Sequence, residues 1–344
     1  MKTIYAYPGS FCPPTFGHLS IVKRAAEFLP EVIVVCSENS NKSGQWFSPQ
    51  KCKELWKTYE LPRNVKISTL GEFLSYSDPK NTNIVLIRGI RDESDMEQER
   101  QVMALNKNKF GIDKYLYILS DDEHKKISST KARMAAQNLR LEELSAYVSP
   151  LVISALLEKT LDMKNIFMVV GRPGSGKSTF LRMLAEENAA NVHIDTDEFN
   201  HELRPLLAKS FPGEDIYSVV RERESEVLKV ITSPWLVLLG RALGQIPKRS
   251  NVFVEIPYGL EENKSIFRFI GGKILHIGCD DSEMNLQRNE NRGTPNIAGF
   301  INKIPDREGA EKIAKAHGLQ MMHIDTGCSL DELGEKAIIF SSQL

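Results

Sequence analysis

The chain has 344 residues, of which 41 % are hydrophobic and 26 % charged, and its formal net charge at pH 7 is -1. This length favours about two domains, each able to bury a core, and the near-neutral charge argues against nucleic acid or an anionic membrane as a partner. The five cysteines include no C-x-x-C pair, which disfavours a disulfide framework or a zinc site. Because the N-terminus reaches Pro8 and Gly9 too early for a signal peptide, and no apolar run approaches the ~20 residues that span a bilayer, we expect a cytoplasmic protein.

The first half alternates short apolar runs with amphipathic stretches. Strands that alternate with helices are typical of a parallel sheet, so we predict an α/β domain. The helical patterns are His18–Phe28, Pro49–Tyr59 and Asp92–Lys107. The predicted strands are Thr3–Tyr7, Val32–Cys36, Val65–Ser68, Ile84–Ile87 and Tyr115–Leu119.

A histidine follows the turn after the first predicted strand. Gly9-Ser10-Phe11 forms this turn, and Thr15-Phe16-Gly17-His18 then opens a helix. The N-terminus of a helix attracts anions, and a histidine there can donate a hydrogen bond to a phosphate oxygen as charge builds on it. The alternative is that His18 only caps or packs against the helix.

Three further segments of the first half carry candidate site residues. Ile87-Arg88-Gly89-Ile90-Arg91 ends a predicted strand, and two guanidiniums there suit a phosphate clamp or, alternatively, a solvated surface. The next helical stretch carries Asp95, Glu99 and Asn106 on one face. Ile127-Ser128-Ser129-Thr130 precedes another helix, where its hydroxyls suit either phosphate or ribose contacts or plain N-capping.

Taken together, the spacing of these elements resembles bacterial-type phosphopantetheine adenylyltransferase over nearly all of residues 1–160. The run from Val85 to Asn106 is the most specific part of the resemblance. It implies a Rossmann-like nucleotidyltransferase domain, residues 1–161, that transfers AMP from ATP to 4′-phosphopantetheine and releases dephospho-CoA and pyrophosphate. ATP is then a co-substrate, Mg²⁺ a cofactor, and catalysis consists of positioning and charge stabilisation.

The resemblance also implies roles for individual residues. The expected catalytic residues are His18, Lys42 and Arg91. The expected substrate-binding residues are Ser10, Lys42, Leu74 and Arg88. The residues expected to bind ATP are Ser10, Phe11, His18, Gly89, Arg91, Glu99, Ser128, Ser129 and Thr130. The chain departs from the family at Cys12, where Asp is usual, whereas Ser10 keeps the hydroxyl of the usual Thr.

The alternation of strands and helices restarts near Asn165. Val152–Leu161 is the predicted closing helix of the first domain, and a second α/β domain is expected over residues 165–344. A glycine-rich turn and the helical stretch Lys177–Asn188 follow its first strand. The predicted strands are Ile166–Val170, Val192–Ile194, Val252–Glu255, Ile274–Ile277 and Met321–Ile324.

The stretch from Gly171 to Ser178 matches G-x-x-x-x-G-K-S between a strand and a helix, the context that predicts a P-loop. Its backbone N–H groups would surround a phosphate, while Lys177 reaches the β- and γ-phosphates as a catalytic residue and Ser178 ligates Mg²⁺. The alternative is a chance glycine-rich loop. The residues expected to bind ATP here are Gly174, Ser175, Gly176, Lys177, Ser178 and Thr179.

Carboxylates and arginines complete this second site. Alternation along a strand predicts Asp195 and Asp197 on one side at the ligand edge of the sheet. One would take a proton from an attacking hydroxyl, and the other would bind the substrate by orienting that hydroxyl or hold a metal through water. Helix capping is the alternative. Glu255 is a metal-side, substrate-side or surface carboxylate. Arg288 and Arg292, four apart, suit a lid over ATP or a solvated helix face.

The second half resembles dephospho-CoA kinase through its P-loop, the Ile194–Asp197 segment, the Arg288 and Arg292 region and Ile324–Gly327. The resemblance implies phosphorylation of the ribose 3′-hydroxyl of dephospho-CoA by a second ATP, with Asp197 as the base. The whole chain then resembles a bifunctional CoA synthase, and the hexamers common among the adenylyltransferases make a homo-oligomer an expectation.

Two alternatives stay open for the second half. Residues 200–250 align poorly with dephospho-CoA kinase, and its His-Pro segment is not evident. The domain is therefore either that kinase or a P-loop kinase for a different small hydroxyl substrate. A regulatory ATP-binding module without transfer activity is the alternative of another class.

Overall fold

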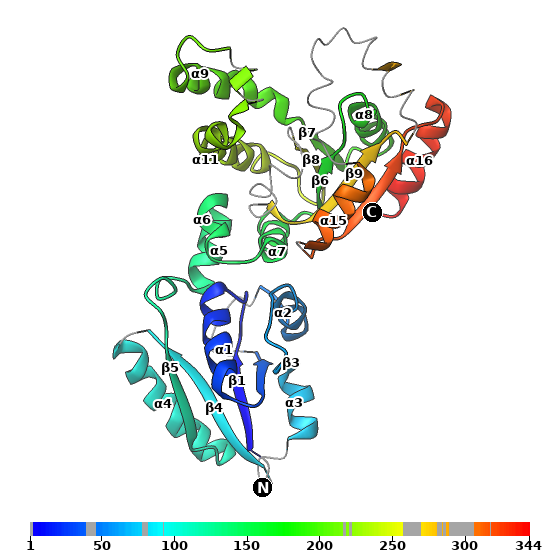
Figure 1. Ribbon diagram of the computed structural model, residues 1–344. Helices are drawn as coiled ribbons and strands as arrows, with labels where there is room; N and C mark the ends of the chain where they lie inside the picture. Colours follow the sequence, from blue (N-terminus) through cyan, green and yellow to red (C-terminus); the bar gives the residue numbers. More distant parts are fainter. Residues whose placement is uncertain are drawn as a thin grey trace. The chain divides into compact units, whose positions relative to one another are not determined.

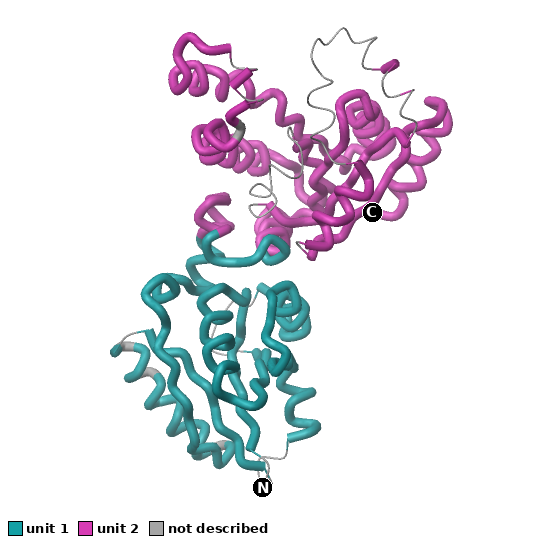
Figure 2. The backbone as a smooth tube through the Cα atoms, in the orientation of Figure 1, with its two compact units in different colours: residues 1–134, 146–152 teal, residues 135–145, 153–344 magenta. Residues whose placement is uncertain are grey.

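The computed structural model describes residues 3–38, 46–77, 82–91, 93–215, 218–219, 222–256, 270–280, 284, 287–288, 306–316 and 318–344. The chain divides into two compact units (Figure 2). Unit 1 comprises residues 1–134 and 146–152, and unit 2 comprises residues 135–145 and 153–344. Each unit contains one five-stranded parallel sheet, so the predicted α/β class is confirmed (Figure 1).

The sheet of unit 1 has the strand order β3-β2-β1-β4-β5. Its strands are β1 (Thr3–Gly9), β2 (Val32–Cys36), β3 (Val65–Thr69), β4 (Asn83–Ile90) and β5 (Lys114–Leu119). Every residue of β2 is buried, as expected for a parallel strand covered on both faces. The chain builds outward from β1 to β3 and then returns to the other side of β1. Ligands of such sheets bind at this switch point, outside the carboxyl ends of the strands.

The helices of unit 1 place the segments that surround this switch point. They are α1 (Phe16–Phe28), α2 (Pro49–Trp56), α3 (Leu70–Tyr76) and α4 (Glu93–Phe110). Helix α1 begins where Thr15 is extended and its hydroxyl accepts a hydrogen bond from the third residue of the helix. Leu19, Val22 and Ala25 recur at helical spacing and are buried, so this face of α1 packs into the core of the unit.

The sheet of unit 2 has the order β10-β9-β6-β8-β7, with all strands parallel. Its strands are β6 (Asn165–Val170), β7 (Asn191–Ile194), β8 (Asn251–Glu255), β9 (Lys273–Gly278) and β10 (Met321–Asp325). Strand β6 is central, with β7 and β8 on one side and β9 and β10 on the other. The glycine-rich turn after β6 therefore lies at the second switch point of the chain.

Helices follow the strands of this sheet along the chain, and α16 comes after the last strand. They are α8 (Lys177–Glu187), the 3₁₀ helix η1 (Thr196–Phe199), α9 (Asn200–Ser210), α11 (Glu224–Leu243), α15 (Arg307–Ala316) and α16 (Leu330–Ser342). Three more segments link the units along the chain: α5 (Ser129–Gln137), α6 (Leu141–Ser145) and α7 (Pro150–Leu161). None of the helices in the described part of the chain is long and apolar enough to span a bilayer.

The core of unit 2 lies between the sheet and the helices α8 and α16, which pack side by side on one of its faces (Figure 1). Phe167 of β6 and Phe253 of β8 stack with their ring centroids 5.0 Å apart. Phe340 of α16 contacts both rings and also Phe180 of α8. This packing fixes the start of α8, and hence the glycine-rich turn, relative to the strands.

Candidate functional site

Unit 1 contains a cavity of about 680 Å³ at the carboxyl ends of β1 and β4. The predicted site residues that line it are Ser10, Phe11, His18, Arg88, Gly89, Arg91, Glu99, Ser128, Ser129 and Thr130. Leu74 lies on α3 with 49 % of its surface exposed and does not line the cavity. Lys42 lies outside the described residues. The structure therefore gathers ten of the predicted positions, from four separate segments, around one space.

The His18 ring is held in one orientation by the residue that caps α1. Its Nδ1 accepts a hydrogen bond from the Thr15 backbone N–H at 3.1 Å and lies 3.0 Å from the Thr15 hydroxyl oxygen. A nitrogen that accepts an N–H carries no proton, so the neutral ring has its proton on Nε2. Capping and chemistry are therefore compatible: Nδ1 caps the helix, and Nε2 is a hydrogen-bond donor in a residue that lines the cavity.

The turn between β1 and α1 is fixed by aromatic packing. Phe11 has a φ of 42°, which is uncommon for a residue other than glycine, and only 3 % of its surface is exposed. Its ring lies 5.1 Å from the ring of His18 and 5.3 Å from that of Trp56, edge to face in both cases. A side chain at Gly9 would put a Cβ 2.7 Å from the Phe11 ring. The glycine is thus needed for Phe11 to support the His18 ring.

Each of the two predicted clamp arginines forms a bidentate pair with a carboxylate of α4. Arg88 donates from Nε to Glu99 at 2.7 Å and from Nη2 at 2.5 Å, and a third hydrogen bond of 3.2 Å reaches the carbonyl oxygen of Pro8. Arg91 donates from Nε and Nη2 to Asp95, both at 2.8 Å. Both guanidiniums are therefore oriented groups in the cavity wall. The interpretation as a solvated surface arginine is wrong for Arg88, whereas the Arg91 side chain is 42 % exposed.

Gly89 lies between these arginines for a steric reason. A Cβ at this position would lie 2.9 Å from Cγ1 of Ile21, a buried residue of α1. The close approach of α1 to β4 brings the histidine at the start of the helix to the same cavity as the arginines.

The segment 128–130 caps α5 as well as lining the cavity. The Ser128 hydroxyl accepts a hydrogen bond from the backbone N–H of Lys131 at 3.2 Å, and the Ser129 hydroxyl donates to the carbonyl oxygen of Pro13 at 2.8 Å. The capping interpretation of this motif is confirmed for Ser128. The second bond ties the segment to the turn that follows β1, so the start of α5 and the start of α1 face one space.

Sequence reasoning missed several polar residues that also line the cavity: Tyr7, Ser37, Glu38, Ser120 and His124. Ser37 and Glu38 follow β2, whose last residue pairs in register with Gly9. No local motif marks such residues, and only the strand order brings them together. Burial raises the pKa of Tyr7 although the nearby Arg88 charge opposes this, so its hydroxyl stays protonated.

Cys12 is buried beside the turn, in contact with the segment before α2. The Phe47 backbone N–H donates to Sγ of Cys12 at 3.3 Å. Hydrogen bonds from the Cys52 thiol, and then from the backbone N–H groups of Phe47 and Trp46, lower the pKa of Cys12 although burial opposes them. Ionised Cys12 would carry a negative charge at the position where the adenylyltransferases usually have Asp.

In unit 2 the predicted phosphate loop runs from the end of β6 directly into α8. Gly176 caps the helix with a φ of 82°, in the left-handed region that glycine tolerates. A Cβ at Gly171 would lie only 2.0 Å from the carbonyl oxygen of Ile277 on β9. Nζ of Lys177 donates to the carbonyl oxygens of Gly171 at 2.9 Å and Arg172 at 3.3 Å, so the lysine ammonium lies over the loop.

Glu255 faces this lysine from the end of β8. Its carboxylate lies 3.5 Å from Nζ of Lys177 and 3.2 Å from Nε2 of His193 on β7. Burial raises the pKa of Glu255, but the imidazole of His193 and the ammonium of Lys177 outweigh it and leave the pKa below its usual value. With 15 % of its side chain exposed, Glu255 is a half-buried carboxylate beside the loop. The interpretation of it as a surface residue is therefore wrong.

Asp195 and Asp197 do not lie on a strand, so the prediction that strand alternation puts them on one side is wrong. Strand β7 ends at Ile194, and Asp195 caps the 3₁₀ helix η1 by accepting a hydrogen bond from the backbone N–H of Asp197 at 2.9 Å. The strand ends here because the aspartate side chain competes for that N–H. Partial burial and the charges of Asp195 and Glu255 raise the pKa of Asp197, whereas Lys177 opposes them.

The remaining predicted residues divide between the described and undescribed parts of the chain. Arg288 donates from Nη2 to the carbonyl oxygen of Thr326, next to the phosphate loop, at 3.0 Å. Arg292 lies outside the described residues. Within the described ranges, no group of three or more His, Cys, Asp or Glu side chains is placed to hold a metal ion.

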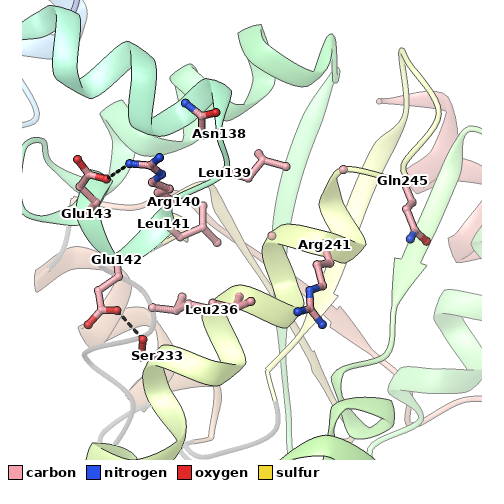
Figure 3. A pocket seen from close by; sticks show the side chains of 13 residues that line it. Asn138, Leu139, Arg140, Leu141, Glu142, Glu143, Ser233, Leu236, Arg241 and Gln245 are labelled. Atoms are coloured by element: carbon pink, nitrogen blue, oxygen red, sulfur yellow. Dashed lines mark hydrogen bonds and ion pairs between the residues drawn. The ribbon is translucent and has the colours of Figure 1, made fainter.

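A second cavity of about 680 Å³ lies in unit 2 between α6 and α11 (Figure 3). Leu141 and Leu236, both buried, form part of its wall. Two polar contacts join residues of its lining: the Ser233 hydroxyl donates to Glu142 at 2.7 Å, and Arg140 donates to Glu143 at 3.3 Å. None of the predicted site residues lines this cavity.

The family model and the two relatives described here match the first half of the chain. A cytidylyltransferase-like family model matches residues 6–135. The phosphopantetheine adenylyltransferase of Leptospira biflexa serovar Patoc is 31 % identical over 160 residues, which are 46 % of this chain and 98 % of that protein. The phosphopantetheine adenylyltransferase of Mannheimia succiniciproducens is 30 % identical over 158 residues, again 46 % of this chain and 98 % of that protein.

Solved structures resemble the chain more distantly. The NadR protein in complex with NR is 17 % identical with a TM-score of 0.37, and the match covers 100 % of this chain and 97 % of that chain. TT1252 from Thermus thermophilus is 19 % identical with a TM-score of 0.42, over 53 % of this chain and 98 % of that one. At these TM-scores the likeness says nothing about the function of the chain.

Proposed function

The chain belongs to the phosphopantetheine adenylyltransferase family, and on that premise we propose that the cavity of unit 1 joins ATP and 4′-phosphopantetheine to make dephospho-CoA. A phosphate oxygen of 4′-phosphopantetheine attacks the α-phosphorus of ATP. A new P–O bond forms, the bond from the α-phosphorus to the bridging oxygen breaks, and pyrophosphate leaves. The substrate phosphate is itself the nucleophile, so no protein group is modified and catalysis consists of positioning and charge stabilisation.

The orientation of His18 is the observation that carries this proposal. Because Thr15 fixes Nδ1 as an acceptor, the neutral ring donates from Nε2, and this donor is assigned to an oxygen of the transferring α-phosphate. Charge grows on that oxygen in the transition state, so a preorganised donor there stabilises the transition state more than the bound substrate.

The two arginines supply the positive charge that the phosphates need. Arg88 is assigned to the attacking phosphate and Arg91 to ATP, together with the start of α5. Their carboxylate partners, Glu99 and Asp95, leave each guanidinium at a defined angle. A positioned guanidinium binds phosphate more specifically than a mobile ammonium. Glu99 is therefore assigned to the attacking phosphate, through the orientation of Arg88, in place of the contact with ATP that the family resemblance implies.

For unit 2 we propose that residues 165–344 form an ATP-dependent kinase that phosphorylates the 3′-hydroxyl of dephospho-CoA. Lys177 over the glycine loop, with Glu255 and Asp197 nearby, supports phosphoryl transfer. Asp197 is assigned as the base, because a raised pKa suits a group that takes a proton from a hydroxyl. The γ-phosphorus of ATP then bonds to the 3′-oxygen, and ADP leaves.

The donor atoms around the loop suit Mg²⁺. Ser178 offers a hydroxyl oxygen, and the nearby carboxylates offer further oxygen atoms, the donors that Mg²⁺ prefers. Mg²⁺ is commonly held by one or two carboxylates together with substrate phosphates, so a complete protein cage is not required. When bound, it would neutralise charge on the phosphates, with Ser178 as its ligand from the chain.

An acceptor panel tests the kinase assignment. The full chain is given radiolabelled ATP with dephospho-CoA, with small nucleosides and with no acceptor, and Lys177→Ala is run alongside. Transfer to dephospho-CoA that depends on Lys177 is the expected result. Transfer to another hydroxyl compound in its place would establish the alternative kinase. ATP binding without transfer to any acceptor would establish a regulatory module.

A further inference from the structure

One buried hydroxyl connects the last strand of unit 2 to the phosphate loop. Thr326 follows β10 and has no exposed surface. Its Oγ1 lies 2.6 Å from the carbonyl oxygen of Ser175 and 3.2 Å from that of Gly278. A hydroxyl has a single proton, so the shorter contact is its donated bond. The Gly278 oxygen already accepts the backbone N–H of Thr326 at 2.8 Å.

The contact between Thr326 and the loop continues at the next residue. A Cβ at Gly176 would lie 3.4 Å from Cβ, Cγ2 and Oγ1 of Thr326, so the threonine side chain fills the space directly beneath the left-handed glycine. Ser175 and Gly176 immediately precede Lys177, the first residue of α8. Thr326 thus supports the two loop residues that set where the lysine starts.

The same threonine holds the one described arginine of the predicted pair. Arg288 donates from Nη2 to the Thr326 carbonyl oxygen at 3.0 Å and from Nη1 to Oγ1 at 3.4 Å. The threonine oxygen accepts from the arginine while donating its proton to the loop. One side chain therefore joins the nucleotide loop to a cation that lies beside it.

We propose that Thr326 is a positioning residue of the ATP site in unit 2, and that its hydroxyl holds the phosphate loop in the shape that accepts a triphosphate. This inference rests on the proposed kinase. Without the hydroxyl, the Ser175 carbonyl oxygen loses this bond inside the protein, and a buried polar group without a partner is costly. The loop would then relax toward other donors and leave its phosphate-binding shape.

Two substitutions separate the hydroxyl from the shape of the side chain. Thr326→Val is nearly isosteric but cannot donate, whereas Thr326→Ser keeps the donor and loses a methyl group. Binding of the non-hydrolysable β,γ-imido analogue of ATP to the full chain is measured by titration calorimetry. The Lys177→Ala variant shows which binding event belongs to unit 2, because only the ATP site of unit 2 contains that lysine.

The expected result is a dissociation constant for the Lys177-dependent site about tenfold higher in Thr326→Val, the size expected for one buried hydrogen bond, and within about twofold of wild type in Thr326→Ser. In steady-state assays the KM for ATP rises while the KM for the acceptor stays unchanged, a split that general loosening of the fold would not give. Equal affinities in wild type and Thr326→Val, or equal losses in both variants, would overturn the inference.

Further outcomes separate this inference from the proposed kinase. If Thr326→Val does not fold, Thr326→Ala removes the same donor with less crowding and is held to the same expectation. If nucleotide binds in a Lys177-dependent way but no acceptor is phosphorylated, the kinase proposal fails and the effect of Thr326 on affinity still decides the inference. If no binding depends on Lys177, both fail.

Discussion

The carboxylate of Glu99 on α4 accepts two hydrogen bonds from the guanidinium of Arg88 on β4, in a pair whose side chains are only 11 % and 23 % exposed. A largely buried ion pair adds little net stability to a fold. Removing one partner is nevertheless costly, because the remaining charge stays largely out of contact with water. It fixes the direction of the arginine at the point where a substrate phosphate is assigned.

We expect Glu99→Gln to destabilise unit 1 by about 1–3 kcal/mol and to raise the KM for 4′-phosphopantetheine, because Arg88 loses its bidentate partner. Urea unfolding and steady-state kinetics measure the two effects. Glu97→Gln is the matched control, since its pair with Arg100 is more than two-thirds exposed on each side and should matter little. Similar behaviour of the two variants would contradict a role for the buried pair.

His18 should act through its Nε2 proton. We expect His18→Ala to lower the rate of AMP transfer roughly 10²–10³-fold, the usual effect of losing one transition-state donor. His18→Gln, whose amide nitrogen can approach the position of Nε2, should retain more activity than His18→Ala. Release of pyrophosphate under saturating ATP measures both. An unchanged rate in His18→Ala would remove this residue from the mechanism.

Gly171 should tolerate no side chain. A Cβ there would lie 2.0 Å from the Ile277 carbonyl oxygen, so Gly171→Ala should destabilise unit 2 by about 2–3 kcal/mol and abolish nucleotide binding there. Gly334→Ala is the control, because a Cβ added at Gly334 in α16 would meet no other atom within 4 Å. Alanine also favours a helix over glycine by up to ~1 kcal/mol. Thermal unfolding distinguishes them, and equal melting temperatures would show that the strand does not approach the loop.

A buried histidine, His276, and a half-buried one, His323, lie on neighbouring strands and should make unit 2 sensitive to acid. His276 on β9 and His323 on β10 contact each other, Nδ1 to Nδ1, at 2.9 Å. Burial, and then the charge of His323, lower the pKa of His276 from 6.5 to about 4. Other charged groups that act on the pair are Asp280, Asp306, Arg172, Arg307 and Asp325.

The direction of the stability change with pH follows from the pH at which the folded and the unfolded chain each take up a proton. The unfolded chain binds one near pH 6.5 and the folded chain only near pH 4, so unit 2 should lose stability as the pH falls through this interval. His276→Asn should flatten that part of the profile relative to wild type. Calorimetric melting of the full chain between pH 7 and 4 provides the measurement, and parallel profiles would exclude His276 as the cause.

The sheets were predictable because buried parallel strands are continuous apolar runs. Val32–Cys36 has the predicted bounds, and the other predicted strands differ by a few residues. Helix α11 was not predicted, since Pro234 lies in its interior and proline removes a helical N–H. Burial of residues such as Trp235 and Leu239 overrides that local cost.

The site was predictable as separate motifs and not as a network. Thr15-Phe16-Gly17-His18 predicted a histidine at a helix start, but the tautomer depends on the Thr15 N–H bond. The pairing of Arg88 with Glu99 depends on how α4 packs beside β4, which local sequence does not record. Asp195 failed as a strand residue because its side chain could cap the turn after the strand, a competition that alternation alone ignores.

One chain should carry out both steps, and mass spectrometry of its products can follow both in a single experiment. The full chain is incubated with 4′-phosphopantetheine, ATP and Mg²⁺, beside Lys177→Ala. Wild type should yield pyrophosphate, ADP and CoA, whereas dephospho-CoA should be the end product of the variant. Absence of any adenylylated product from wild type, or continued CoA formation by Lys177→Ala, would contradict this expectation.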